Sequence, residues 1–433
     1  MHRVVILGAG YAGLEACKKM VQGLGRELER GEVEITLVST ELYHTFHGWT
    51  GEVLGGLLPL EHTLTPLDLL PFLKRVRFVE GRVTALNLGA QQVTVQSKLG
   101  PEILGYEHVF LGLGSRDPFE RIPGLERFGW GLKNTRHMQN FRAELHNRIA
   151  QALEGKRPLE RVAVVGGGFA GVECAAALAE LFQDAYKNHS RASRPQITLL
   201  QSGTHLLETL RPRFSRIANY ATAQLEGYGV EIRYGTRISE ITARGVQLED
   251  GQALEATMVL VTAGISLLDL PGSETLSRDP RRRIKTNPFL QVEGQSRVWS
   301  GGDSAKVSHP WRSSEDCPVN ALWAMKQGLH AGLNIARVVK GHKPRPFRYP
   351  GLGQAASLGW GRGISEIYGM QFTGMLGWLL RIGFFVWYMP SKKRGFQVLS
   401  DLLTLKKRGR KLEPMLLELF SVRAEDRLER TAP

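Results

Sequence analysis

The stretch that decides the fold is VVILGAGYAGLEACKKM, from Val4 to Met20. Its apolar, β-branched start is typical of a buried strand, and its second half is typical of a helix. Between them Gly8, Gly10 and Gly13 have the GxGxxG spacing. The first glycine permits a tight turn, the second lets the backbone approach a pyrophosphate, and the third lets helix and strand pack closely. The stretch therefore predicts a dinucleotide-binding unit with phosphate at the helix N-terminus.

A second stretch repeats this pattern 160 or so residues later, as roughly expected for two separate domains. It reads RVAVVGGGFAGVECAAALAEL, with Gly166, Gly168 and Gly171 at the same spacing. One GxGxxG is a weak signal, but two in a strand-to-helix context are specific. The chain is therefore predicted to be an α/β protein with two Rossmann-like, doubly wound dinucleotide-binding domains.

The strand that follows each glycine turn lacks the acid that normally binds a ribose. The first ends at Ser39 and the second at Gln201. Ser39 can still hydrogen-bond a ribose hydroxyl. Gln201 neither binds a 2′-hydroxyl strongly nor repels a 2′-phosphate, because it has no charge. We therefore expect weak discrimination between NADH and NADPH, with Arg211 and Arg213 as possible phosphate donors.

Cysteine content and charge exclude several classes of protein. Cys17, Cys174 and Cys317 are far apart and form no CxxC, which argues against a disulfide scaffold, a dithiol centre and a metal site. The net charge is +14, and the segment from 336 to 411 alone carries 15 − 2 = +13. This basic segment is interleaved with GMLGWLLRIGFFVWYM, so an anionic membrane surface is the expected partner. No nucleic-acid module is visible, and no nucleic acid is expected.

Two further segments resemble the "ATG" and "GD" motifs of the two-dinucleotide-binding flavoproteins. They are YEHVFLGLGS, which contains Gly114, and SRVWSGGDSAKV, which contains Asp303. In that family the GD aspartate binds FAD. The resemblance implies FAD at Gly8, Gly10, Gly13, Ser39, Gly114 and Asp303, and NADH or NADPH at Gly166, Gly168, Gly171 and Gln201.

Within the flavoproteins the chain resembles the type II NADH dehydrogenases. The segments that carry this are YHTF, GGGFAGVECAAALAEL, PFRYPGLGQAASLGWGRGISEI and FTGMLGWLLRIGFFVWYM, in this order. The resemblance implies a single-subunit, non-proton-pumping NAD(P)H:quinone oxidoreductase of the respiratory chain. It also implies hydride transfer from nicotinamide to FAD, and electron transfer on to a quinone.

Two site assignments follow from this resemblance. Glu173 lies in the first turn of a predicted helix, where an acid interacts favourably with the helix dipole, and in the family it lies near the nicotinamide and quinone. The family's Ala-Gln-x-x-x-Gln motif of the quinone site aligns with Ala321, Leu322 and Lys326. The two changed positions share one helix face. Lys326 could hydrogen-bond a quinone carbonyl or stabilise negative charge, or it could point to solvent.

The apolar segment from Phe372 to Met389 contains a single formal charge, Arg381. A span needs about 20 residues, and a charge in mid-bilayer is costly. We expect a helix that lies in the interface, with peripheral attachment to the cytoplasmic face of the cell membrane. Packing of the segment against the protein's own core or a second subunit is an alternative, and a homodimer is left open.

The expected domains are an FAD-binding domain (1–115 and 280–350), an NAD(P)H-binding domain (116–279) and a membrane-associated helical extension (351–433). Two other functions compete with quinone reduction. One is a flavoprotein reductase with a non-quinone acceptor, or with a sulfide-type donor reaction through Cys317. The other is a membrane-docked nucleotide-binding protein that regulates and has little turnover.

Overall fold

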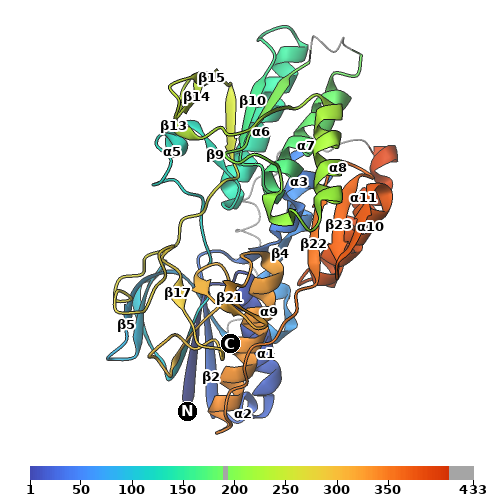
Figure 1. Ribbon diagram of the computed structural model, residues 1–433. Helices are drawn as coiled ribbons and strands as arrows, with labels where there is room; N and C mark the ends of the chain where they lie inside the picture. The colour runs from blue at the N-terminus through green and yellow to red at the C-terminus, as the bar shows by residue number, and fades with distance from the viewer. Residues whose placement is uncertain (189–193, 409–433) are drawn as a thin grey trace.

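The computed structural model describes residues 1–188 and 194–408, which form two large sheets with their helices and a C-terminal layer (Figure 1). The first sheet has the strand order β18-β8-β1-β2-β5-β6-β7. Its strands are β1 (His2–Leu7), β2 (Val33–Ser39), β5 (Arg77–Asn87), β6 (Gln92–Ser97), β7 (Gly100–Gly105), β8 (His108–Leu111) and β18 (Val298–Ser300). The five strands from β18 to β5 are parallel, so their carboxyl ends share one edge of the sheet.

Helices α1 (Tyr11–Gly23) and α9 (Ala321–Val339) pack closely against each other beside this sheet. Their approach depends on Gly328 and Gly332 of α9. A Cβ atom at these positions would lie 2.0 Å from the carbonyl oxygen of Ala12 and 2.3 Å from that of Ala16. This contact joins a segment near residue 330 to the first glycine turn.

The second sheet has the order β12-β11-β10-β16-β9, with every neighbouring pair parallel. Its strands are β9 (Trp130–Gly131), β10 (Arg161–Val165), β11 (Gln196–Leu200), β12 (Glu231–Arg233) and β16 (Met258–Val261). It is accompanied by helices α6 (Thr135–Leu153), α7 (Phe169–Ala185) and α8 (Ser215–Tyr228), and by the antiparallel strands β13 (Ile238–Thr242), β14 (Gly245–Leu248) and β15 (Ala253–Glu255). The predicted domain boundaries stay a prediction, although each sheet draws its strands from the expected parts of the chain.

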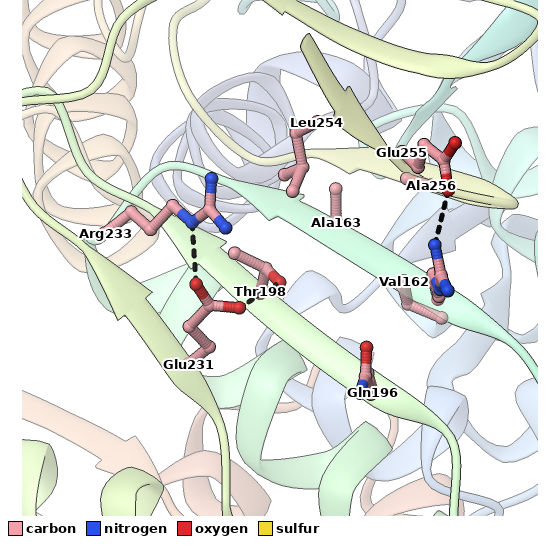
Figure 2. A pocket seen from close by; sticks show the side chains of 10 residues that line it. Val162, Ala163, Gln196, Thr198, Glu231, Arg233, Leu254, Glu255 and Ala256 are labelled. Atoms are coloured by element: carbon pink, nitrogen blue, oxygen red, sulfur yellow. Dashed lines mark hydrogen bonds and ion pairs between the residues drawn. The ribbon is translucent and has the colours of Figure 1, made fainter. Parts of the chain in front are cut away.

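A cleft of about 340 Å³ lies between β10, β11 and β12 and the chain around β15 (Figure 2). Two ion pairs line it. Arg161 contacts Glu255 at 2.5 Å, and Arg233 contacts Glu231 at 2.7 Å. The cleft includes the first residues of β10 and β11, whereas dinucleotides bind beyond the carboxyl ends of parallel strands. It is therefore not the expected nucleotide site.

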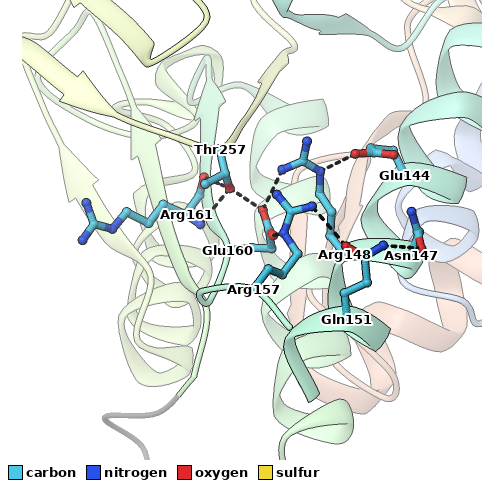
Figure 3. A network of polar contacts seen from close by, with 8 residues as sticks. All are labelled: Glu144, Asn147, Arg148, Gln151, Arg157, Glu160, Arg161 and Thr257. Atoms are coloured by element: carbon cyan, nitrogen blue, oxygen red, sulfur yellow. Dashed lines mark hydrogen bonds and ion pairs between the residues drawn. The ribbon is translucent and has the colours of Figure 1, made fainter. Parts of the chain in front are cut away.

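A buried carboxylate connects α6 to the amino ends of β10 and β16 (Figure 3). Glu160 is fully buried and lies 3.4 Å from Arg148 Nη1 and 3.3 Å from Arg157 Nε. It also accepts a hydrogen bond from the Thr257 hydroxyl. Removing one partner of a buried ion pair is costly, so this network fastens the helix to the sheet.

The C-terminal layer contains a small sheet as well as helices, which refines the predicted helical extension. The antiparallel strands β22 (Gly353–Ser357), β23 (Gly363–Ile367) and β24 (Met370–Thr373) precede α10 (Gly374–Tyr388) and α11 (Lys392–Arg408). Phe372 lies in β24, so the predicted helix begins two residues later than expected. Residues 409–433, including the last basic residues of the charged segment, lie outside the described residues.

The remaining short elements connect these layers. They are helices α2 (Gly25–Glu29), α3 (Thr50–Leu54), α4 (Leu60–Thr63) and α5 (Leu125–Phe128), and strands β3 (Tyr43–Thr45), β4 (Leu64–Pro66), β17 (Ile284–Lys285), β19 (Ala305–Lys306), β20 (Ser308–His309) and β21 (Arg312–Asp316). Among these, α3 packs against α7 and thereby links the first part of the chain to the second sheet.

Candidate dinucleotide and acceptor sites

The first glycine turn leaves no room for side chains at two of its three glycines. Gly8 has a φ of +99°, and a Cβ atom there would lie 2.5 Å from the carbonyl oxygen of Gly112. A Cβ atom at Gly13 would lie 1.8 Å from the carbonyl oxygen of Gly8. Gly10, at the N-terminus of α1, faces open space instead. This turn can therefore bring backbone N–H groups close to a pyrophosphate.

The second glycine turn has the same construction. Gly166 has a φ of +113°, and a Cβ atom at Gly171 would lie 1.7 Å from the Gly166 carbonyl oxygen. Gly168 precedes α7 and again faces open space. The predicted pair of dinucleotide turns is thus present in the backbone.

Asp303 lies in a polar cluster beside the first turn. Its Oδ2 atom accepts hydrogen bonds from Ser115 Oγ (2.5 Å) and Lys133 Nζ (3.0 Å). The backbone N–H groups of Leu132 and Lys133 in turn donate to the carboxylate of Asp117 (3.0–3.2 Å), which positions the lysine. Lys133 was not predicted, because nothing in the sequence around it marks it as a partner of a residue 170 positions away.

His44 supplies an unpaired polar atom next to the same turn. Its Nδ1 atom lies 3.1 Å from the carbonyl oxygen of Ala9, so Nδ1 carries the proton and donates. Burial lowers the pKa of His44 to about 4, and the ring is neutral at pH 7. Among the described residues its buried Nε2 atom has no hydrogen-bond partner. A buried acceptor without a partner fits a site that a polar ligand completes.

The two strand ends that lack an acid differ. Ser39 is half-buried, and its Oγ atom accepts the N–H of Glu41 (3.3 Å). The Gln201 side chain is buried and both ends of its amide are used. Oε1 accepts the N–H of Gly167 (3.0 Å), and Nε2 donates to the carbonyl oxygen of His205 (3.0 Å). Gln201 therefore holds the glycine turn against the following loop.

Arg381 lies at the centre of a buried ionic cluster. Its guanidinium contacts Glu52 of α3 (2.7 Å), Glu173 of α7 (2.8 Å) and the carbonyl oxygen of Gly48 (2.7 Å). Its side chain is fully buried within the protein. Of the three arrangements considered for the apolar segment, packing against the protein's own core is therefore the one that Arg381 adopts.

Glu173 shares this single guanidinium with a second carboxylate. Its Oε1 atom also accepts the N–H of Ser357 (2.7 Å), and 15% of its side chain remains exposed. Burial raises the pKa of Glu173 to about 7, against the effect of Arg381, and the nearby charge of Glu52 raises it further. The cluster can therefore hold one proton near neutral pH.

Leu322 and Lys326 lie on α9, as predicted, one turn apart. Leu322 is buried, Ala321 follows the N-cap residue Asn320, and Lys326 is half-buried. The ammonium of Lys326 lies 5.7 Å from the ring centroid of Tyr349 and 5.4 Å from that of Tyr388 in α10. Among the described residues no carboxylate pairs with it. Lys326 therefore faces an aromatic surface where α9 meets the C-terminal layer.

Comparison with known proteins identifies the family. Residues 2–328 match the family model described as pyridine nucleotide-disulphide oxidoreductase. The chain belongs to the pyridine nucleotide-disulphide oxidoreductase family. The predicted two-dinucleotide-binding fold and the expectation of an oxidoreductase are thereby confirmed.

Relatives within this family support the predicted branch. Type II NADH:quinone oxidoreductases of Staphylococcus saprophyticus and Staphylococcus aureus are each 27% identical over 380 residues, which cover 86% of this chain and 91% of theirs. The NDH2 structure from Plasmodium falciparum in complex with NADH superposes with a TM-score of 0.83 at 14% identity, over 95% of this chain and 99% of that one. The expected resemblance to type II NADH dehydrogenases is confirmed.

A second structural neighbour shares the fold alone. The sulfide:quinone oxidoreductase of Aquifex aeolicus superposes with a TM-score of 0.71 at 14% identity, over 93% of each chain. The cysteines of this pyridine nucleotide-disulphide oxidoreductase do not favour sulfide chemistry. Cys17, Cys174 and Cys317 are all buried, and burial raises the pKa of the Cys317 thiol to about 12. A thiolate is the reactive form, so Cys317 is poorly suited to attack.

Two negative findings concern only residues 1–188 and 194–408. No helix there is both long and apolar enough to cross a membrane. No group of three or more His, Cys, Asp or Glu side chains there is arranged to hold a metal ion.

Proposed function

We propose that this protein oxidises NADH or NADPH and passes the electrons through FAD to a membrane quinone, without pumping protons. The observation that carries the proposal is the presence of two glycine turns in which backbone contacts exclude side chains while the middle glycine stays open. Bound FAD supplies the redox chemistry, as cofactors do in such enzymes. The protein's part is to bind, orient and neutralise charge.

The first unit, residues 1–115 and 280–350, would hold FAD. Gly8, Gly10, Gly13 and Gly114 allow close approach of the backbone, Ser39 can reach the ribose, and Asp303 offers a carboxylate positioned by Ser115 and Lys133. The neutral His44 offers its Nε2 atom as an acceptor. These residues fit the polar chain of FAD.

The second unit, residues 116–279, would bind the pyridine nucleotide at Gly166, Gly168 and Gly171, with Gln201 supporting the turn.

The quinone would bind where α9 meets α10. Leu322 and Ala321 offer apolar contacts, and Lys326 can donate a hydrogen bond to a quinone carbonyl or stabilise the negative charge that develops on reduction. Glu173 can hold the proton that a reduced quinone takes up, because its pKa lies near neutrality. These roles rest on the positions of the side chains and on the likeness to quinone reductases.

The outer faces of α10 and α11 would attach the enzyme to the membrane. Six large apolar residues keep about half or more of their surface exposed: Met375, Leu376, Leu379, Trp387, Phe396 and Leu403. Lys392 and Lys393 are exposed at the junction of the two helices. Apolar side chains beside cations suit an anionic bilayer surface. We place this surface at the cytoplasmic face of the cell membrane, and a homodimer remains an additional proposal.

Purified protein tests the redox function directly. It should be yellow with about one FAD per chain, a stoichiometry that follows from the single pair of flavin motifs. NADH or NADPH should bleach the flavin, and a soluble quinone should restore it. Asp303→Ala should lower FAD occupancy sharply, whereas Asp269→Ala, at an exposed ion pair, should not. Colourless protein from flavin-rich cells, or bleached flavin that no quinone reoxidises, contradicts the proposal.

The quinone and membrane roles need separate variants. Leu322→Gln with Lys326→Gln should change the KM for quinone and leave flavin bleaching by NADH intact.

Replacing Leu376, Leu379 and Trp387 with serine should reduce flotation with anionic liposomes while FAD content is retained. Deletion of α10 would be a poor test, because it removes the buried Arg381. If the triple variant still floats with the liposomes, and high salt does not release it, the exposed faces of α10 and α11 are not the membrane-binding surface.

A further inference from the structure

The loop after β11 brings an acid to the strand end that lacks one. Gln201 ends the strand, and its amide already bonds to Gly167 and His205. Seven residues later, Glu208 folds back toward the strand end. Its Oε1 atom accepts the backbone N–H of Thr204 at 3.1 Å. The carboxylate of Glu208 is therefore hydrogen-bonded to the backbone three residues after Gln201, the position at which the ribose-binding acid is normally found.

Two features of the backbone accompany this position of Glu208. A Cβ atom at Gly203 would lie 1.7 Å from Glu208 Oε1, so the carboxylate occupies space that only a glycine leaves free. Leu207 has a φ of +53°, which is strained for a leucine. Its N–H donates to the carbonyl oxygen of Gly167 (2.9 Å), which fastens the strained residue to the glycine turn.

The arginines near this loop are engaged elsewhere. Arg211 donates to the carbonyl oxygen of Leu206 (3.3 Å) and to Asn219 Oδ1 (2.8 Å). Arg213 lies over the ring of Phe214, with its guanidinium carbon 5.1 Å from the centroid. Among the described residues none forms an ion pair with Glu208. Both expected phosphate donors therefore have partners other than Glu208.

We propose that Glu208 is the specificity-determining acid for the pyridine nucleotide and makes this enzyme select NADH over NADPH. The proposal rests on the proposed function. A carboxylate at the strand end can accept the 2′-hydroxyl of NADH and repels the 2′-phosphate of NADPH. Glu208 also accepts the N–H of Thr204, so this N–H group cannot donate to a phosphate oxygen of NADPH. Gln201 alone led us to expect weak discrimination between NADH and NADPH. With Glu208 at the strand end, we expect a preference for NADH instead.

The test compares both nucleotides in holoenzyme and uses two readouts. The first is the rate of flavin bleaching by NADH and by NADPH. The second is the Kd of NAD⁺ and of NADP⁺ by calorimetry. Wild type should favour NADH by about fiftyfold or more, and Glu208→Gln should reduce that ratio at least about tenfold, mainly through better NADPH binding, as removal of one close like charge predicts. Glutamine keeps the acceptor for Thr204, so the loop should remain folded.

Glu255→Gln is the matched control, because it removes one carboxylate from the same unit at an exposed ion pair in the cleft of Figure 2. It should leave the ratio unchanged. Equal use of both nucleotides by wild type, or an unchanged ratio in Glu208→Gln, overturns the inference. If neither nucleotide bleaches the flavin but NAD⁺ still binds more tightly than NADP⁺ in a manner that depends on Glu208, the proposed function fails and the inference stands.

Discussion

The two nucleotide units share one turn and differ at the strand end beside it. In both, the third glycine of the turn meets the carbonyl oxygen of the first at a distance that excludes any side chain. In the first unit the strand ends at Ser39, a half-buried residue whose Oγ atom accepts a hydrogen bond from the N–H of Glu41 at 3.3 Å. In the second it ends at Gln201, whose amide is bonded at both ends. The turns therefore have the same backbone construction, whereas the side chains at the two strand ends are held differently.

Arg381 joins the two units, and its loss should have the largest effect. Arg381→Met leaves Glu52 and Glu173 buried without their cation, so the free energy of unfolding should fall by about 3–5 kcal/mol. Chemical denaturation measures this, and proteolysis should cut near α10 first. Lys393→Met, at an exposed lysine, is the control and should change little. A loss below about 1 kcal/mol would mean that the cluster does not hold the units together.

Alanine substitutions in the glycine turns separate folding from binding. Gly13→Ala and Gly171→Ala place a methyl group within 2 Å of a backbone oxygen, so each should destabilise the protein by about 3 kcal/mol. Gly10→Ala and Gly168→Ala face open space and should cost less than about 1 kcal/mol. These two should instead weaken FAD retention and NAD⁺ binding, respectively. Thermal unfolding, FAD content and calorimetry distinguish the pairs, and similar Tm values for all four would contradict this account.

The titration of Glu173 makes stability depend on pH. Its folded pKa of about 7 lies above the ordinary value near 4.5, so the folded protein binds the proton more tightly than the unfolded chain. The stabilisation is present below about pH 4.5 and is lost as the pH rises through 7, by about 3 kcal/mol in all. Unfolding curves of wild type and Glu173→Gln between pH 5 and 8 should therefore diverge. If the stabilities of the two proteins change with pH in the same way, Glu173 is not the group that binds the proton.

Restoring an acid at each strand end should give the smallest and most unequal effects. Gln201→Glu loses the donor to the His205 carbonyl and brings two oxygens together, at a cost of about 1–2 kcal/mol. Ser39→Glu, at a half-buried position, should change stability by less than about 0.5 kcal/mol. The Tm values of the two variants, each compared with that of wild type, test this difference. Equal effects would show that the two strand ends are equivalent after all.

The sequence by itself determined the two turns, the parallel strands beside them, the flavoprotein motifs and the family. These features are local, because a glycine turn between a β-branched run and a helix is encoded within about 20 residues. Gly8 and Gly166 have the left-handed backbone that the pattern implies. Leu322 and Lys326 likewise share a helix face, because residues four apart in a helix always do.

Only the tertiary structure decided which charges meet. Lys133 reaches Asp303 across 170 residues, and Arg381 reaches Glu52 across 329. No periodicity relates such positions, because an ion pair of this kind depends on how whole elements pack. Arg381 illustrates the point. In the sequence it is a charge inside an apolar segment, but once α10 lies on α3 and α7, two buried carboxylates make the protein interior its most stable place.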